Sequence, residues 1–194
     1  MKLSVVMLAK NAQETIGKSL ESLKAFDEVI LYINNSEDDT LKIAQSYKNV
    51  KIIEGDFLGF GPTKNEAASF SRNEWIFSLD SDEIIPPKLL SELEILSYEN
   101  EDEVFIIKRD NYFHDKKIKH SGWGKDYLVR IYHKQKHHFN DNVVHEKIHL
   151  TANSKKTTLK NSFKHLAITD ISQFLSKIIV TQNLLLKIRK HVFL

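Results

Sequence analysis

Two aspartates spaced one residue apart have the clearest potential for chemistry in this chain. Asp80 and Asp82 come directly after residues 75–79, an apolar run that is typical of a buried strand. In open α/β folds, ligands bind at the carboxyl ends of such strands. Two carboxylates in that place suit Mg²⁺ or Mn²⁺, ions that share their coordination shell with substrate phosphates. We therefore expect Asp80 and Asp82 to hold a divalent metal, with capping of a helix near Pro86 as the structural alternative.

The composition is that of an ordinary globular protein without cysteine. The chain has 194 residues, of which 41% are hydrophobic and 28% are charged. That length allows one domain with a sizeable core. The lack of cysteine excludes a disulfide framework, a thiolate nucleophile and Cys-bound zinc. The opening apolar segment is too short for a signal peptide and no stretch is long enough to span a bilayer, so we expect a cytoplasmic protein.

Charge is distributed unevenly along the chain. Residues 1–103 carry 10 Lys and Arg against 20 Asp and Glu, whereas residues 104–194 carry 18 against 6. A basic surface suits anionic partners such as phosphorylated acceptors or an anionic membrane leaflet, although a solvated face is the plain alternative. No RNA- or DNA-binding pattern accompanies the charge, so nucleic acid is not an expected partner.

The order of apolar runs and helical patterns predicts the architecture. In the first half, strands are expected at residues 3–8, 28–33, 50–53 and 75–79, with helices starting near Asn11, Asp38, Asn65 and Pro86. This alternation predicts a doubly wound parallel sheet. In the second half, strands are expected at 104–109, 128–133 and 143–150 without helices between them. We expect a nucleotide-binding half, residues 1–103, and a mixed β region with a final helix, residues 104–194, for the second substrate.

Five segments stand in a fixed order along the chain. They are Ser4–Asn11, Gly59–Asn65 (G-F-G-x-x-K-N), Leu79–Glu83 (L-D-x-D-E), Gly122–Arg130 (G-W-x-x-D-x-x-x-R) and Val144–Glu146 (V-H-E). In this order they resemble family 2 glycosyltransferases with the GT-A fold, and more narrowly the lipopolysaccharide-core glucosyltransferase-like branch. The resemblance covers about residues 3–180. It implies a Rossmann-like, mostly parallel sheet followed by a mixed β acceptor region and a C-terminal helix.

The resemblance also implies a reaction and its donor. The reaction would move a hexose, with inversion, from a nucleotide sugar, UDP-hexose above all, to a saccharide in lipopolysaccharide or lipooligosaccharide core assembly. Asp80 and Asp82 would hold Mg²⁺ or Mn²⁺ against the diphosphate, with Asp82 as the stronger candidate for direct coordination. The residues expected near the donor are Lys10, Asn11, Asn34, Lys64 and Asp80. Asn34 stands where this family commonly has an acidic residue that reads the nucleoside.

On the acceptor side, the resemblance implies a general base and its neighbours. Asp126 is the candidate base, and Glu146 is its rival. Trp123 is expected to stack on a sugar face, and Arg130 to pair with Asp126 or to bind phosphate. His145 is a further candidate for the acceptor site, as a rival base or third metal contact. Three histidines without metal-ligand spacing are expected at the surface: His133, His137 and His138.

Two other functions remain open from the sequence. One is a nucleotidyltransferase, which would be expected to carry a glycine fingerprint in its first loop, whereas residues 9–12 have none. The other is a truncated, inactive relic that binds a glycan or nucleotide. For the active enzyme, a lipid-linked oligosaccharide acceptor would place the protein at the inner face of the cytoplasmic membrane. An apolar stripe near the end of the chain suits peripheral contact with anionic lipid. It consists of Ile171, Phe174, Leu175, Ile178 and Ile179.

Overall fold

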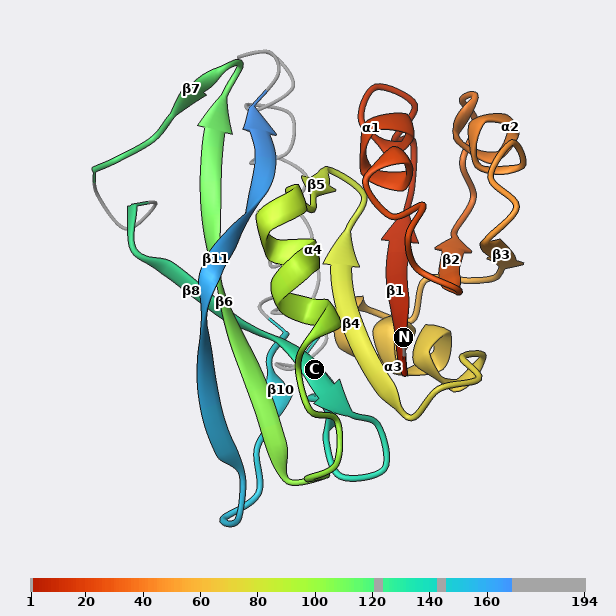
Figure 1. Cartoon of the computed structure of the whole chain (residues 1–194). Helices are drawn as coiled ribbons and strands as arrows, with labels where there is room; N and C mark the ends of the chain where they lie inside the picture. Colours follow the sequence, from red (N-terminus) through yellow and green to blue (C-terminus); the bar gives the residue numbers. More distant parts are fainter. Residues whose placement is uncertain (1, 121–123, 143–145, 169–194) are drawn as a thin grey trace, which may run out of the picture.

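The computed structural model describes residues 2–120, 124–142 and 146–168 (Figure 1). Trp123, His145 and the expected C-terminal helix from Ile171 lie outside these described residues, as does part of the strand expected at 143–150. None of the helices in the described part of the chain has the length and apolar character needed to cross a membrane.

The four strands expected in the first half are present and run parallel. They are β1 (Leu3–Ala9), β2 (Val29–Ile33), β3 (Val50–Glu54) and β4 (Trp75–Asp80). Their order in the sheet is β3-β2-β1-β4, and the arrowheads of β1, β2 and β4 point the same way in Figure 1. The inner strands are buried on both faces, which explains their continuous apolar sequences. The carboxyl ends of the strands therefore meet at one edge, where the candidate site lies.

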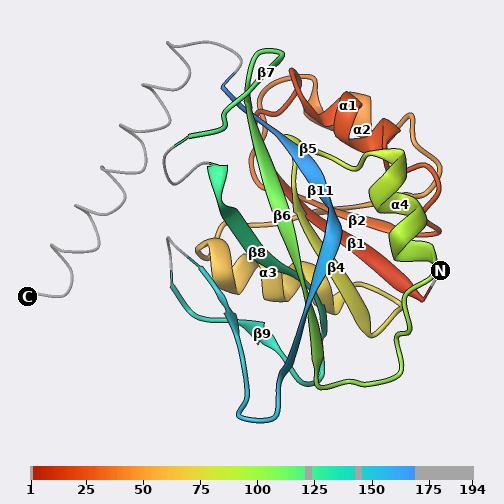
Figure 2. The ribbon, with the colours of Figure 1, turned by 60° about the vertical axis from the view of Figure 1, so that its left-hand side comes forward.

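Helices cover both faces of this half of the sheet. Three helices pack on one face: α1 (Ile16–Glu21), α2 (Thr40–Ala44) and α4 (Pro87–Glu94). The opposite face is covered by α3 (Phe60–Ser69), as Figure 2 shows. Two apolar clusters, one on each face, hold these layers together. The expected α/β class with helices on both faces is confirmed.

The second half adds strands to the same sheet. The strand β8 (Asp126–His133) pairs antiparallel with β4, and β6 (Glu103–Phe113) follows it. The next strand, β11 (Lys155–Ile168), runs parallel to β6 and also pairs with the short β5 (Glu83–Ile84). The long β6 and β11 lie side by side in Figures 1 and 2. The sheet is therefore mixed.

Two small elements complete the described chain. The strand β7 (Lys116–Lys117) pairs with the end of β6. A separate ribbon joins β9 (His138–Phe139) to β10 (Ile148–His149), and Phe139 packs in the same apolar cluster as α3. The ribbon therefore lies against α3 through Phe139.

The expectation that Asn11 begins a helix is wrong. The helix α1 begins at Ile16, with Thr15 before it. Asn11 has a φ of 49°, its backbone N–H donates to Ser36 Oγ at 3.0 Å, and its Oδ1 accepts from the Glu37 N–H at 2.9 Å. Asn tolerates this left-handed conformation better than most residues. Asn11 therefore ties the loops after β1 and β2 together.

The helix α3 begins at Phe60 rather than at Asn65. Gly59 precedes it with a φ of 107°, a conformation that favours glycine. A Cβ on Gly61 would lie 1.9 Å from the carbonyl oxygen of Asn140, so only glycine fits there. Pro62 lies in the first turn, where its missing N–H costs nothing. The two glycines therefore serve the geometry of the helix start.

The expectation that His133 and His137 lie at the surface is also wrong. They are 6% and 1% exposed, respectively, whereas His138 is exposed as expected. The cause is the apolar packing around the turn after β8, where the His133 ring meets Trp75 edge-on at 5.4 Å.

Candidate active site

Asp80 and Asp82 lie at the carboxyl end of β4, at the edge where the parallel strands of an α/β sheet present ligands. Asp80 Oδ1 accepts from Lys64 Nζ at 3.0 Å, and Oδ2 accepts from Arg130 Nη2 at 3.1 Å. The Oδ1 atom of Asp82 lies 3.5 Å from His165 Nε2. Burial opposes the charged form of Asp80, yet Lys64 and Arg130 outweigh it and hold the Asp80 pKa well below its usual range. Asp80 is therefore a fixed carboxylate between two cations.

Lys64 connects Asp80 to Glu146, which lies between β9 and β10. Its side chain is 5% exposed, and Nζ also donates to Glu146 Oε1 at 2.7 Å. The ammonium lies over the Phe139 ring, 5.2 Å from its centroid. Burial alone would lower the Lys64 pKa, but the attraction of Asp80 and Glu146 raises it above the usual value. Lys64 is thus a permanent cation that joins two carboxylates.

Arg130 joins Asp80 to a second buried carboxylate. Its Nη2 donates to Glu83 Oε1 at 2.5 Å, and the Glu83 side chain is fully buried. The other oxygen of Glu83, Oε2, accepts the backbone N–H of Asp80 at 3.0 Å. Burial raises the pKa of Glu83 to about 7, although the positive charge of Arg130 acts in the opposite direction. Burial would lower the pKa of Arg130, but the negative charges of Glu83 and Asp80 raise it above its usual value.

The expected pairing of Arg130 with Asp126 is wrong, because Arg109 takes that place. Arg109 Nε donates to Asp126 Oδ2 at 2.7 Å, and Asn111 Nδ2 donates to the same oxygen at 3.1 Å. The register of β6 against β8 places Arg109 directly opposite Asp126. Arg130 lies four residues along β8 and faces β4 and β5 instead. Asp126 therefore has an oriented carboxylate whose hydrogen bonds both end on Oδ2.

Seven side chains of alternating sign connect these contacts, and we call them the charged network. In order of contact they are Glu146, Lys64, Asp80, Arg130, Glu83, Arg109 and Asp126. The weakest contact is 3.6 Å, between Arg109 Nη1 and Glu83 Oε1. The network brings the metal candidate Asp80 and both candidate bases into one site. Such an arrangement of fixed charges is suited to a reaction in which negative charge develops on a leaving group.

The donor set at the strand end fits a divalent metal that is shared with a substrate. Within the described ranges, no group of three or more His, Cys, Asp or Glu side chains is arranged to hold a metal by itself. Asp80 and Asp82 provide two carboxylates, and Mg²⁺ is commonly bound by one or two carboxylates together with water and substrate phosphates. Asp80 is held by two cations, and Asp82 lies 3.5 Å from His165.

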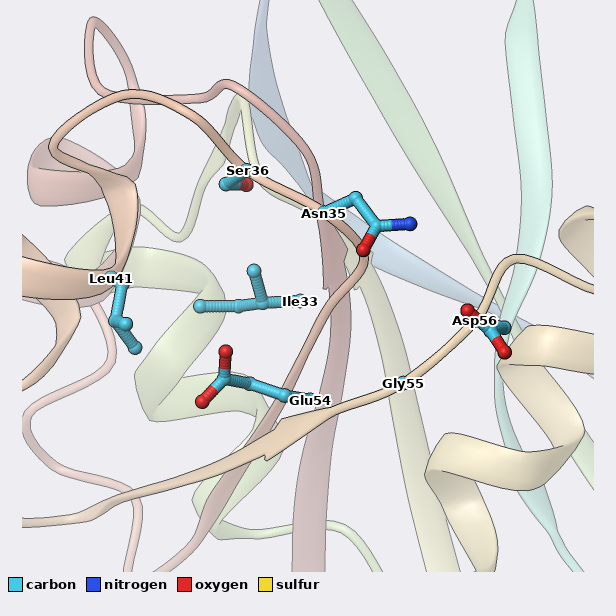
Figure 3. A pocket seen from close by; sticks show the side chains of 7 residues that line it. All are labelled: Ile33, Asn35, Ser36, Leu41, Glu54, Gly55 and Asp56. Atoms are coloured by element: carbon cyan, nitrogen blue, oxygen red, sulfur yellow. The ribbon is translucent and has the colours of Figure 1, made fainter.

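A cavity of about 330 Å³ lies at the ends of β2 and β3, next to the loop that follows β1. Figure 3 shows Ile33 and Leu41 on one side of it and the polar side chains around them. Its lining residues are Ile33, Asn35, Ser36, Leu41, Glu54, Gly55 and Asp56.

The expected donor residues Lys10, Asn11 and Asn34 are not among the residues that line this cavity. Asn34 is buried, and its N–H donates to Ala9 O at 3.2 Å, which joins the ends of β1 and β2. Lys10 is exposed, next to Asn11. Asn35 and Ser36, the next residues after Asn34, are the ones that reach the cavity.

Sequence reasoning assigned no role to four residues of the site. Glu83 ends the L-D-x-D-E motif, and Arg109 and Asn111 share one face of β6 by period-two alternation. His165 also lies in the site, where its Nδ1 is 2.6 Å from Asn111 Oδ1 and its Nε2 is 3.5 Å from Asp82 Oδ1. A longer β6 in the prediction would have revealed the Arg109 and Asn111 pair.

Comparison with known proteins gives the same family that the motifs indicate. Residues 4–166 match the family model described as glycosyl transferase family 2. An uncharacterized glycosyltransferase of Rickettsia typhi is 35% identical over 103 residues, which cover 52% of this chain and 35% of the relative. The poly(ribitol-phosphate) beta-glucosyltransferase of Bacillus spizizenii is 31% identical over 120 residues, or 56% of this chain and 19% of that protein. The lipopolysaccharide core biosynthesis glycosyltransferase LpsC of Rhizobium meliloti is 28% identical over 97 residues, or 48% and 36%.

A solved structure shows the same fold. Residues 1–349 of Staphylococcus aureus TarS, crystallised with UDP, superpose with a TM-score of 0.63 at 20% sequence identity, covering 84% of this chain and 60% of that one. The expected GT-A fold is thereby confirmed. The chain spans about a third or less of the length of the curated relatives named above. With the family model matching most of its length, the chain belongs to glycosyl transferase family 2.

Proposed function

We propose that this chain is the catalytic domain of an inverting, metal-dependent glycosyltransferase that moves a hexose from UDP-hexose to a saccharide acceptor. The observation that carries the proposal is the charged network, which joins the strand-end carboxylate Asp80 to the candidate bases Asp126 and Glu146. Neither a binding module nor a relic requires seven charged side chains to be held in one site. The named relatives are glycosyltransferases, which supports the same reaction class.

The nucleoside would occupy the cavity beside Asn35 and Asp56. Ile33 and Leu41 offer an apolar wall to a base or ribose, and the amide and carboxylate groups offer hydrogen-bond partners. The diphosphate would then extend toward Asp82, where Mg²⁺ or Mn²⁺ would act as a Lewis acid that neutralises the phosphates. TarS binds UDP, which supports this choice of nucleotide.

The residues of this chain would carry the proton transfer and orient the reactants. The acceptor hydroxyl oxygen attacks the anomeric carbon while the bond from that carbon to the phosphate oxygen breaks, and the nucleoside diphosphate leaves with the bonding electrons. Asp126 Oδ1 takes the hydroxyl proton, because Oδ2 is held by Arg109 and Asn111. Attack from the face opposite the leaving group inverts the anomeric centre. Glu146 is the second candidate base, although its Oε1 is bound to Lys64.

For the acceptor we propose a lipid-linked oligosaccharide of the lipopolysaccharide or lipooligosaccharide core. The five motifs of the sequence and the relative LpsC support this acceptor. Poly(ribitol phosphate) is the competing acceptor, because one relative of higher identity acts on it according to its name. A lipid-linked acceptor would place the protein at the cytoplasmic face of the membrane. The basic second half and the apolar stripe from Ile171, which lies outside the described residues, suit peripheral contact there.

The function is tested by transfer from radiolabelled UDP-hexoses to two acceptor preparations. We expect purified protein with Mn²⁺ to label core lipopolysaccharide acceptor and to leave poly(ribitol phosphate) unlabelled. The reverse result would replace the acceptor while keeping the enzyme class. Binding of UDP without transfer to either acceptor, and without hydrolysis of any UDP-hexose, would favour the inactive binding module.

A further inference from the structure

One fully buried carboxylate takes no part in the reaction proposed above. Glu83 is 0% exposed and lies at the start of β5, immediately after Asp82. Burial of a carboxylate is costly unless cations and hydrogen-bond donors surround it. A buried carboxylate therefore needs close partners, and the contacts of Glu83 indicate its role.

Both oxygens of Glu83 are engaged by groups of the active site. Oε1 accepts from Arg130 Nη2 at 2.5 Å and lies 3.6 Å from Arg109 Nη1. Oε2 accepts the backbone N–H of Asp80 at 3.0 Å. Glu83 thus holds the backbone of one aspartate and the side chains of two arginines.

Each arginine in turn binds one aspartate of the proposed reaction. Arg130 Nη2 donates to Asp80 Oδ2 at 3.1 Å, on the donor side. Arg109 Nε donates to Asp126 Oδ2 at 2.7 Å, on the acceptor side. A single shift of Glu83 would therefore move both aspartates, and misplacement of reacting groups by about 1 Å can cost about 10²-fold in rate.

We propose that Glu83 is a positioning residue that holds Asp80 and Asp126 in their relative places through Arg130 and Arg109. It thereby couples donor binding to the orientation of the base. The inference rests on the proposed function, since it needs a donor on the Asp80 side and a base at Asp126. Glu83 itself exchanges no proton with substrate.

A second buried carboxylate on the same sheet provides the matched control. Asp110 is 8% exposed, and its Oδ2 accepts from Lys117 Nζ at 2.5 Å and from Ser162 Oγ at 2.7 Å. None of these partners belongs to the charged network. Asp110→Asn removes a buried, ion-paired charge of the same kind, so it reports the effect of lost stability alone.

The test is a pair of double-mutant cycles with Glu83→Gln, which replaces the carboxyl group by an amide at nearly constant volume. We expect E83Q to lower kcat about tenfold or more and to weaken binding of UDP with Mn²⁺, measured by calorimetry, about threefold or more. In the Asp126→Asn background, E83Q should change kcat by less than about twofold. In the Asp80→Asn background, it should change UDP affinity by less than about twofold. The reason is that the effects of mutations at coupled residues do not add. Additive effects in either cycle overturn the proposal, as does an equal loss in Asp110→Asn.

Arg109→Gln keeps the proposal testable if E83Q does not fold, because the Arg109 side chain is 24% exposed. We expect R109Q to lower kcat about tenfold while UDP affinity stays within about twofold, since the contact of Arg130 with Asp80 remains. An unchanged kcat in R109Q would overturn the link to Asp126. Wild-type protein that binds UDP but transfers no hexose would contradict the proposed function, and the affinity cycle with Asp80 would still decide the role of Glu83.

Discussion

The Lys64 ammonium lies 2.7 Å from Glu146 Oε1, although 82 residues separate the two in the sequence. This contact joins the start of α3 to the loop before β10, and through Asp80 it reaches the end of β4. The Gly59–Asn65 segment, whose Lys64 was expected near the donor, therefore places this lysine among carboxylates. Lys64 would have to exchange one of these carboxylates for a donor phosphate in order to bind it directly.

Removal of the Lys64 charge should destabilise the fold. Lys64→Met removes the only cation that Glu146 contacts in the charged network and leaves Asp80 with Arg130 alone. Breaking a buried ion pair costs about 3 kcal/mol or more. We expect urea denaturation to show a loss at the lower end of that range, because both carboxylates keep some contact with solvent. The exposed Lys42→Met is the control and should leave the midpoint unchanged. Adding Glu146→Gln to Lys64→Met should recover part of the lost stability, because the carboxylate left without a cation is then also removed. A further loss of stability in the double variant would contradict the stabilising role of the Lys64–Glu146 ion pair.

Asp82→Asn should abolish hexose transfer while leaving the fold intact. The amide keeps the volume of the side chain but is a much poorer ligand for Mg²⁺ or Mn²⁺ than a carboxylate. Transfer, thermal unfolding and Mn²⁺ binding by calorimetry measure the three effects separately. The exposed Asp115→Asn serves as the control. Full transfer by D82N, or by wild-type protein in EDTA, would be incompatible with a metal at this site.

Asp126→Asn should lower kcat by about 10²-fold or more, the usual scale for a lost general base. Donor affinity should change little, because Asp126 lies at the other end of the charged network from Lys64. Steady-state kinetics with varied donor and varied acceptor separate these effects. Glu146→Gln is the paired variant. If E146Q shows the loss in kcat and D126N does not, Glu146 is the base.

The stability of the fold should fall in mild acid because of His137. Burial lowers the pKa of His137, whose Nε2 lies 2.9 Å from Ser154 Oγ. The unfolded state therefore binds a proton as the pH falls through about 6.5, while the native state stays neutral until lower pH, so stability decreases on acidification. The measurement compares the free energy of unfolding at pH 7.5 and at pH 5.5, which lie about one unit either side of the ordinary histidine pKa of about 6.5. We expect the drop between these two pH values to be smaller in His137→Gln than in the wild-type protein. The exposed His149→Gln should keep the wild-type drop, and an equal drop in both variants would exclude His137 as the cause.

Peripheral membrane binding should be electrostatic and should require anionic lipid. Lysines that accompany the apolar stripe, such as Lys187 and Lys190, are attracted to an anionic leaflet, and salt screens this attraction. We expect sedimentation with anionic liposomes at low salt, less sedimentation as salt rises, and none with neutral liposomes. The charge-reversal variant Lys187→Glu/Lys190→Glu should sediment less. Equal, negligible sedimentation with both lipids at low salt would argue against the membrane contact.

The parts of the fold that depend on local patterns could be predicted from the sequence. The parallel strands β1 to β4 are continuous apolar runs, and their boundaries agree with prediction within about one residue. The 14-residue strand β11 was not predicted, because its polar residues hide a pairing with β6 that is far away in sequence. Long-range pairing of this kind depends on the whole sheet rather than on the periodicity of one segment.

The candidate site was predictable in its carboxylates but not in their partners. Asp80, Asp82 and Asp126 stand at recognisable places in motifs, whereas the choice between Arg109 and Arg130 as partner of Asp126 depends on the register of β6 against β8. A shift of one residue in that register would turn Arg109 to the other face of the sheet. The sequence motifs therefore suggested which carboxylates belong to the site, and only the assembled sheet shows which side chains contact them.

The position of β11 has a consequence for how the protein is made on the ribosome. Residues 83 and 84 of β5 pair with residues 165 and 164 of β11, and the Asp82 carbonyl accepts the N–H of Leu166. The turn that carries Asp82 and Glu83 is thus synthesised about 80 residues before the strand that secures it. A nascent chain shorter than about 166 residues contains all four parallel strands but lacks the residues that pair with this turn. The geometry of the candidate site can therefore be completed only late in translation, after all four parallel strands of the first half have been synthesised.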